Sequence, residues 1–367
     1  MTATATPRLL SLDVFRGVTV AAMILVNNPG DWGHIYAPLE HSVWNGCTPT
    51  DLIFPFFLFI VGVSIVYAME SKAAVKVNHS KMLWAAFRRM VILIAISLAT
   101  QLLFHPGFEN LRFPGVLQRI GVVYFVSTLL FLKTQQRTRD VLFAALLIGY
   151  YIIMVWLPVP DTGKPGLDPE TNMGAWVDRV VFTTNHLWSE SKTWDPEGLL
   201  GTLPAIATCL FGVRVGSWLK RKDRDDAVKV NWLFTCGIIA VVGGMLWGLF
   251  FPINKALWTS SFVLYTGGWA TIGLALCYWL IDVQGYKSAA LFFVPLGVNA
   301  ILAYVLSNYI PHYITNKPYF GTQSLYKVLF EPYFPPYLAS ALSGVFLVII
   351  IWVLMYVLYK RKIVIKV

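Results

Sequence analysis

The chain has 367 residues, of which 57% are hydrophobic and only 13% are charged, whereas a soluble domain carries about 25% charged residues. Apolar runs recur from end to end without a long polar block, which excludes an ordinary soluble fold and favours a single membrane domain over residues 1–367. The net charge of +10 comes from Lys and Arg residues clustered between these runs, which argues against a nucleic-acid partner.

Ten segments are apolar and about 20 residues long, the length needed to cross about 30 Å of hydrocarbon as a helix. We therefore predict an all-α polytopic membrane protein with about ten transmembrane helices. The predicted spans are 12–28, 51–70, 83–104, 115–132, 140–157, 198–219, 231–250, 258–281, 289–308 and 338–358.

The loops between these spans alternate in charge. Lys and Arg gather at residue 8 and at 72–89, 133–139, 220–229, 287 and 360–366. Basic loops stay in the cytoplasm, so both termini are predicted to be cytoplasmic. The opposite loops, about 29–50, 158–197, 251–257 and 309–337, are predicted to face outward. No removable signal peptide is expected, because the first ten residues lack a short apolar core and cleavage site.

Charged residues inside predicted spans need partners, because an unpaired charge in hydrocarbon is costly. Asp13 and Arg16 lie three residues apart on the first span, so either they form a local ion pair or Arg16 helps to hold a phosphate. Arg119, in the fourth span, is expected to face the bundle interior and to need a carboxylate or phosphate partner.

The first outer loop gathers polar side chains around His41. A lone histidine in a loop is usually a surface residue, but Asn27, Trp44, Asn45 and Asp51 lie in the same short stretch. These neighbouring polar side chains make His41 a candidate catalytic residue.

Asp51 and Glu197 each lie at the outer start of a predicted span. They are either helix-cap carboxylates or ligands for sugar hydroxyls or an ammonium group. No metal-ligand spacing and no common hydrolase, nucleotide-binding or metalloprotease motif occurs, so no metal is predicted.

Several of these residues lie in segments that resemble the heparan-alpha-glucosaminide N-acetyltransferase family. The similar segments are RLLSLDVFRGVTVAAMILVNN, HSVWNGCTPTDLIFPFFLFIVGVSI, RFPGVLQRIGVVYF, WDPEGLLGTLPAIATCLFGVRVG, PINKALWTSSFVL and FVPLGVNAILAYV. The resemblance implies transfer of acetyl from cytoplasmic acetyl-CoA to the amine of a terminal glucosamine across the membrane. It also places the active-site histidine at His41 and a functional asparagine at Asn27, and gives Arg119 a structural or cofactor-associated role.

The residue types suit this chemistry. An amine attacks a thioester only when unprotonated, so an imidazole such as His41 is the natural base. A fixed amide donor stabilises the oxyanion, a role assigned to Asn27, with Asn45 less favoured. Both direct transfer and an acetyl-histidine intermediate fit the sequence.

The remaining candidates are assigned to the two substrates. The residues predicted to bind the cofactor are Arg16, Arg88, Arg89 and Arg119, and those predicted to bind the acceptor are Trp44, Asn45, Asp51 and Glu197.

Two other functions compete with acetyl transfer to glucosamine. One is an amino-sugar transporter with its site in the middle of the bundle, and the other is an acyltransferase that modifies a different cell-envelope acceptor. The topology without a signal suits a bacterial inner membrane, and the resemblance also suggests a homodimer.

Overall fold

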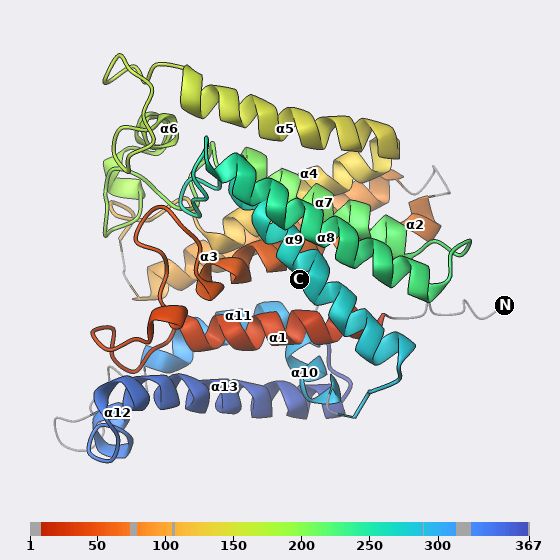
Figure 1. Ribbon diagram of the computed structural model, residues 1–367. Coiled ribbons are helices and arrows are strands. Elements are labelled where there is room, and N and C mark those ends of the chain that lie inside the picture. Colours follow the sequence, from red (N-terminus) through yellow and green to blue (C-terminus); the bar gives the residue numbers. More distant parts are fainter. Residues whose placement is uncertain (1–8, 74–78, 105–106, 289, 313–323, 366–367) are drawn as a thin grey trace. The chain divides into compact units, whose positions relative to one another are not determined.

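The computed structural model describes residues 9–73, 79–104, 107–288, 290–312 and 324–365. Residue 8, residues 74–78 and 366–367 of the predicted basic clusters, and residues 313–323 of the predicted 309–337 loop lie outside these ranges. Within the described ranges the chain forms helices joined by loops, with no strand, which confirms the predicted all-α class (Figure 1).

Eight helices in the described part are long and apolar enough to cross a membrane. Their bounds are Pro49–Glu70, His79–Phe104, Val116–Lys133, Gln136–Trp156, Thr202–Leu219, Asp226–Gly248, Ser260–Val283 and Pro336–Lys360. The chain is therefore a polytopic membrane protein.

Two of the ten predicted spans take other forms. The span predicted at 12–28 is α1 (Leu10–Val26), which has only 17 residues. The span predicted at 289–308 is divided into η6 (Ala290–Phe292), α10 (Val294–Val298) and α11 (Ala300–Pro311). The division between α10 and α11 lies at Asn299, whose ψ of 40° departs from the helical value.

The chain folds into two compact units. The first comprises residues 1–42, 48–57 and 273–367. Besides α1, α10 and α11, it contains the 3-10 turns η1 (Ala37–Leu39) and η2 (Pro49–Leu52), the π-helix η5 (Tyr278–Val283), and helices α12 (Leu325–Leu329) and α13 (Pro336–Lys360).

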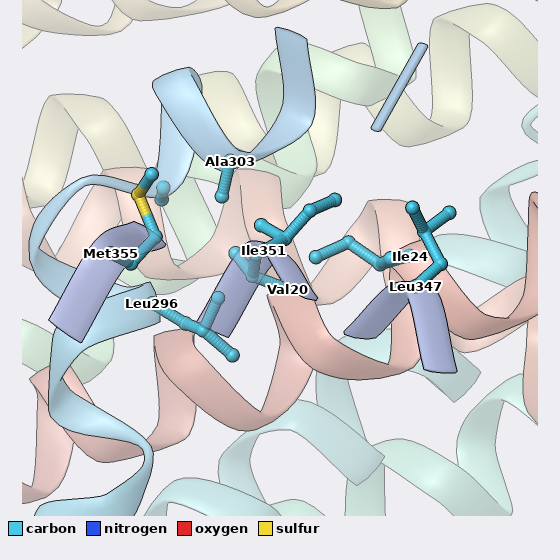
Figure 2. Close-up of a cluster of buried hydrophobic side chains, with 8 residues drawn as sticks. Val20, Ile24, Leu296, Ala303, Leu347, Ile351 and Met355 are labelled. Atoms are coloured by element: carbon cyan, nitrogen blue, oxygen red, sulfur yellow. The ribbon is translucent and has the colours of Figure 1, made fainter. Parts of the chain in front are cut away.

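The core of the first unit joins four helices. In Figure 2, apolar side chains from α1, α10, α11 and α13 converge on one cluster. The labelled members are Val20, Ile24, Leu296, Ala303, Leu347, Ile351 and Met355. Two glycines let α1 and α10 approach closely, because a Cβ atom would lie 1.9 Å from the Phe293 carbonyl oxygen at Gly17 and 2.0 Å from the Asp13 carbonyl oxygen at Gly297.

The second unit comprises residues 43–47 and 58–272. Its helices are most of α2 (Ile53–Ala73), α3 (His79–Phe104), α4 (Val116–Lys133), α5 (Gln136–Trp156), α6 (Met173–Phe182), α7 (Thr202–Leu219), α8 (Asp226–Gly248) and most of α9 (Ser260–Cys277), with the 3-10 turn η4 (Thr184–His186). One core cluster packs the end of α5 against the start of α6 and residues near 251–257, through Tyr150, Met154, Val159, Met173, Phe251 and Leu257.

Candidate active site

His41 and Asp51 form a hydrogen-bonded pair in the first unit. The Nδ1 atom of His41 lies 2.7 Å from Oδ1 of Asp51. The His41 side chain is 47% exposed, whereas the Asp51 side chain is only 1% exposed. The buried Asp51 carboxylate therefore holds the His41 ring, which is itself partly exposed at the surface of the protein.

The Asp51 carboxylate is fixed by the turn that carries it. Thr48 precedes η2 and forms a capping box with Asp51, in which the Thr48 N–H donates to Oδ2 of Asp51 at 3.0 Å. The N–H of Ser42, next to His41, donates to the same oxygen at 3.1 Å. One carboxylate thus caps η2, holds the backbone beside His41 and holds its ring.

This arrangement sets the tautomer of the neutral His41 ring. An ionised carboxylate only accepts hydrogen bonds, so Nδ1 carries the hydrogen and donates it to Asp51. The lone pair then lies on Nε2, the nitrogen that is able to take a proton. Of the two interpretations of Asp51, the cap is the one seen here, and the pairing with His41 was not predicted.

Asn27 is the residue at which α1 ends. Its backbone N–H donates to the carbonyl of Met23 at 3.1 Å, and the residue is exposed. The turn η2, which holds Asp51, lies against α1. Asn27, His41 and Asp51 therefore belong to the same compact unit.

Arg16 contacts one residue of its own helix and one residue of α10. Its Nη1 atom lies 3.3 Å from Oδ1 of Asp13 and donates to the carbonyl oxygen of Gly297 at 3.0 Å. The predicted ion pair between Asp13 and Arg16 is present, and Arg16 also ties α1 to α10. Its predicted role at a phosphate stays a prediction.

Trp44 and Asn45 belong to the second unit, although they follow His41 closely in the sequence. The indole N–H of Trp44 donates to the Leu167 carbonyl at 3.0 Å, and its ring meets that of Trp194 edge-on at 5.0 Å. The Asn45 side-chain oxygen accepts a hydrogen bond from buried Asn254 at 3.1 Å. Both predicted acceptor ligands therefore have structural partners here.

Glu197 is part of a three-residue ion-pair network. The Arg112 guanidinium donates to Asp195 through Nε at 2.7 Å and through Nη2 at 2.6 Å, and its Nη2 also donates to Glu197 at 2.5 Å. Burial alone would lower the pKa of Arg112, but its bonds to the two carboxylates outweigh that effect and raise the pKa. The Glu197 side chain is thus paired with Arg112, and its predicted role at the acceptor stays a prediction.

Arg119 is only 2% exposed and faces the protein interior, as predicted. Its Nη2 donates to the Gly198 carbonyl at 2.9 Å, and its guanidinium carbon lies 5.1 Å from the centre of the Trp258 ring. The prediction was a carboxylate or a phosphate partner: no carboxylate lies within ion-pair distance among the described residues, and the phosphate stays a prediction. Arg119 instead contacts a backbone carbonyl, through a hydrogen bond, and the Trp258 ring.

Asp178 is a buried acidic residue that lies close to Arg119. Both residues line a small cavity of about 20 Å³, and Asp178 Oδ1 accepts a hydrogen bond from the Leu199 N–H at 2.8 Å. Burial raises the pKa of Asp178 to about 7, and the neighbouring charge of Asp195 acts in the same direction.

Arg88 and Arg89, two of the predicted cofactor ligands, are consecutive residues of α3. Arg88 is exposed, and Arg89 places its guanidinium carbon 4.7 Å from the centre of the Tyr124 ring on α4. Their predicted contact with cofactor phosphates stays a prediction. Among the described residues, no group of three or more His, Cys, Asp or Glu side chains is arranged to hold a metal ion.

Three site features escape analysis of the sequence: the pairing of Asp51 with His41, the Arg112 network, and buried Asp178. Asp51 lies 10 positions after His41 in the sequence, and Asp195 lies 83 positions after Arg112. No local spacing indicates such contacts, because tertiary folding creates them. The motif WDPEG, which contains both Asp195 and Glu197, was the one available signal for the network.

Comparison with known proteins confirms the resemblance seen in the sequence. The model of the heparan-alpha-glucosaminide N-acetyltransferase catalytic family matches residues 8–246. The heparan-alpha-glucosaminide N-acetyltransferase of Mus musculus is 30% identical over 408 aligned positions, which cover 97% of this chain and 60% of the relative. That of Homo sapiens is 32% identical over 361 positions, 83% of this chain and 54% of the relative. The chain thus spans little more than half the length of these relatives.

Proposed function

The chain belongs to the heparan-alpha-glucosaminide N-acetyltransferase catalytic family, and from that premise we propose that it transfers an acetyl group from cytoplasmic acetyl-CoA to the amine of a glucosamine-type sugar on the extracytoplasmic side of the membrane. The observation that carries the proposal is the pair formed by His41 and Asp51, with Nδ1 2.7 Å from the carboxylate. An acyltransferase that uses an amine acceptor needs such an oriented base.

In the proposed reaction the acceptor nitrogen attacks the carbonyl carbon of the thioester. A C–N bond forms to give a tetrahedral intermediate, the C–S bond breaks as that intermediate collapses, and Nε2 of His41 takes the proton that the nitrogen loses. That proton then passes to the departing CoA thiolate, so the products are the N-acetylated sugar and free CoA. Asp51 stabilises the imidazolium that exists between these two steps.

Asn27 is assigned to the oxyanion of the tetrahedral intermediate, with Asn45 as the less favoured donor. Its place at the end of α1, in the same unit as His41, supports Asn27. A fixed amide donor stabilises such an oxyanion by about 3 kcal/mol.

The remaining assignments are kept as proposals. Arg16, Arg88, Arg89 and Arg119 are assigned to acetyl-CoA, and Trp44, Asn45, Asp51 and Glu197 to the acceptor sugar. The exposed Arg88 on α3 suits a phosphate contact better than buried Arg119, because phosphate groups must reach the side chain. A bacterial inner membrane is the proposed location, and a homodimer the proposed assembly.

The test compares two histidines that each pair through Nδ1 with a carboxylate at the same distance. His34 lies in the same outer stretch, and its Nδ1 is 2.7 Å from Oδ2 of Asp31, so it is a matched control for His41. Purified protein is given acetyl-CoA and glucosamine, and release of CoA thiol and formation of N-acetylglucosamine are followed.

We expect His41→Ala to lower kcat at least about 100-fold, the usual contribution of a general base. Binding of CoA should persist, and His34→Ala should keep the wild-type rate. Unchanged turnover in His41→Ala would remove this residue as the base, and lack of any acetyl transfer by the wild-type protein would reject the glucosamine acceptor.

A further inference from the structure

The segment from Asp195 to Gly201, here called the 195–201 loop, precedes α7 and is held through both its side chains and its backbone. Its two acidic side chains, Asp195 and Glu197, bind Arg112. Its backbone is held by side chains from two other elements, Arg119 of α4 and Asp178 of α6.

The backbone contacts involve consecutive residues. Arg119 donates through Nη2 to the carbonyl oxygen of Gly198 at 2.9 Å, and Asp178 accepts from the N–H of Leu199 at 2.8 Å. A donor and an acceptor thus hold the two sides of the Gly198–Leu199 region, which fixes both the position and the orientation of the loop.

Both side chains lie close to glycines of the loop. A Cβ atom at Gly198 would lie 2.0 Å from Oδ2 of Asp178, and a Cβ atom at Gly201 would lie 3.1 Å from Nη2 of Arg119. The first distance is far below van der Waals contact, so any larger residue at position 198 would displace the Asp178 side chain. The backbone at Gly198 therefore packs directly against the Asp178 carboxylate.

The guanidinium of Arg119 has donors to spare. Its Nε and Nη1 atoms are buried without a hydrogen-bond partner in the described part of the protein. Leaving such donors unsatisfied costs roughly 1–3 kcal/mol, and more for a charged group. The cavity that Arg119 and Asp178 share with Tyr150, Asn172 and Trp194 has a volume of about 20 Å³, enough for one water molecule.

We propose that this cavity is a water site joining Arg119 to Asp178, and that the two side chains are positioning residues that hold the 195–201 loop for binding of the acceptor sugar. The water would accept from Arg119 and donate to the Asp178 carboxylate. The inference rests on the proposed function, because Glu197, on this loop, is assigned to the acceptor.

Three variants separate positioning from other roles. Asp178→Ala removes the acceptor for the Leu199 N–H, whereas Asp178→Asn keeps an oxygen at that place. Arg119→Lys keeps the charge and loses the planar set of donors. Arg214→Lys on α7 is the matched control, because Arg214 is exposed and has only a 3.8 Å contact with Asp140.

Hydrogen–deuterium exchange of the full-length protein tests the hold on the loop without using activity. We expect exchange in the 195–201 segment to become roughly tenfold faster in Asp178→Ala, the effect of losing one buried hydrogen bond. Arg119→Lys should act in the same direction, and Asp178→Asn and Arg214→Lys should resemble the wild type. Unchanged exchange in both Asp178→Ala and Arg119→Lys would overturn the proposal.

Kinetics test the consequence for the acceptor. We expect Asp178→Ala to raise KM for glucosamine about tenfold, with KM for acetyl-CoA unchanged and with recovery in Asp178→Asn. A fall in kcat at constant KM would contradict a positioning role. If the wild type does not acetylate glucosamine, the proposed function fails while the exchange result still decides whether the two residues hold the loop.

The water is tested directly by an experimental map that resolves solvent. A peak within hydrogen-bond distance of Nε or Nη1 of Arg119 is the expected result. An empty cavity would contradict the water site.

Discussion

The Asp51 carboxylate orients the one histidine that the sequence singles out. Its two oxygens meet the His41 ring, the Ser42 N–H and the Thr48 N–H, so the ring is tied to the same group that caps η2. The position of His41 was predicted from the H-x-x-W-N-G resemblance, but its partner was not. The pairing depends on the chain turning back through η2, which residue spacing does not reveal.

Replacement of Asp51 by Asn tests this dependence. The Asn side chain keeps a similar size but has no charge to stabilise the imidazolium, and its amide is able to favour the wrong tautomer of His41. We expect kcat to fall by about 10²- to 10⁴-fold, with acetyl-CoA affinity unchanged in a direct binding measurement. Asp31→Asn, at the corresponding partner of His34, is the control; equal losses in the two variants would show that Asp51 has no special role.

The helical elements were largely predictable because hydrophobic length is a strong signal. Eight predicted spans correspond to helices of sufficient length. The break in the segment predicted at 289–308 was not foreseen. Asn299, the residue at the break, contacts residues far away in the chain. The buried side chain of Asn299 donates to the Ile363 carbonyl at 3.2 Å and accepts from the Ile365 N–H at 2.9 Å, contacts that no local pattern indicates.

Close packing between α2 and α7 gives a prediction at the level of helices. A Cβ atom at Gly212 would lie 2.0 Å from the Phe59 carbonyl oxygen, and one at Gly62 would lie 2.0 Å from the Cys209 carbonyl oxygen. We expect Gly212→Ala to lower the free energy of unfolding by roughly 1–3 kcal/mol, because the two helices must move apart. Thermal unfolding of the purified protein measures the change.

Gly149→Ala on α5 is the control for this prediction, because a Cβ atom at Gly149 meets nothing within 4 Å. Alanine should there leave the stability unchanged or raise it by up to about 1 kcal/mol. Similar losses in both variants would mean that glycine at Gly212 does not serve the contact between helices.

At the scale of the whole molecule, large apolar side chains are exposed along the long helices. On α8 they include Trp232, Ile238, Ile239, Val242, Met245 and Leu246. In water these side chains would form a large exposed apolar surface, whereas in a bilayer the lipid chains cover it. The membrane class was predictable from composition alone, but the orientation in the membrane rests on loop charge and stays a prediction.

Cysteine labelling tests the orientation. In a variant whose four native cysteines are replaced by alanine, one cysteine is placed at Val43 in the predicted outer loop or at Lys222 in a predicted cytoplasmic cluster; both positions are exposed. A membrane-impermeant maleimide should label Val43→Cys in spheroplasts, and Lys222→Cys only after the membrane is permeabilised. The reverse pattern would place the 29–50 loop in the cytoplasm.

The most direct measurement is an experimental structure with a non-reactive thioether analogue of acetyl-CoA bound. The proposed mechanism predicts that the sulfur of the analogue, and the carbon that replaces the acetyl carbonyl, lie beside the His41 ring. The gap between that carbon and Nε2 of His41 should be the size that lets one amine nitrogen contact both. A reactive end far from His41, with another side chain beside it, would contradict the proposed mechanism.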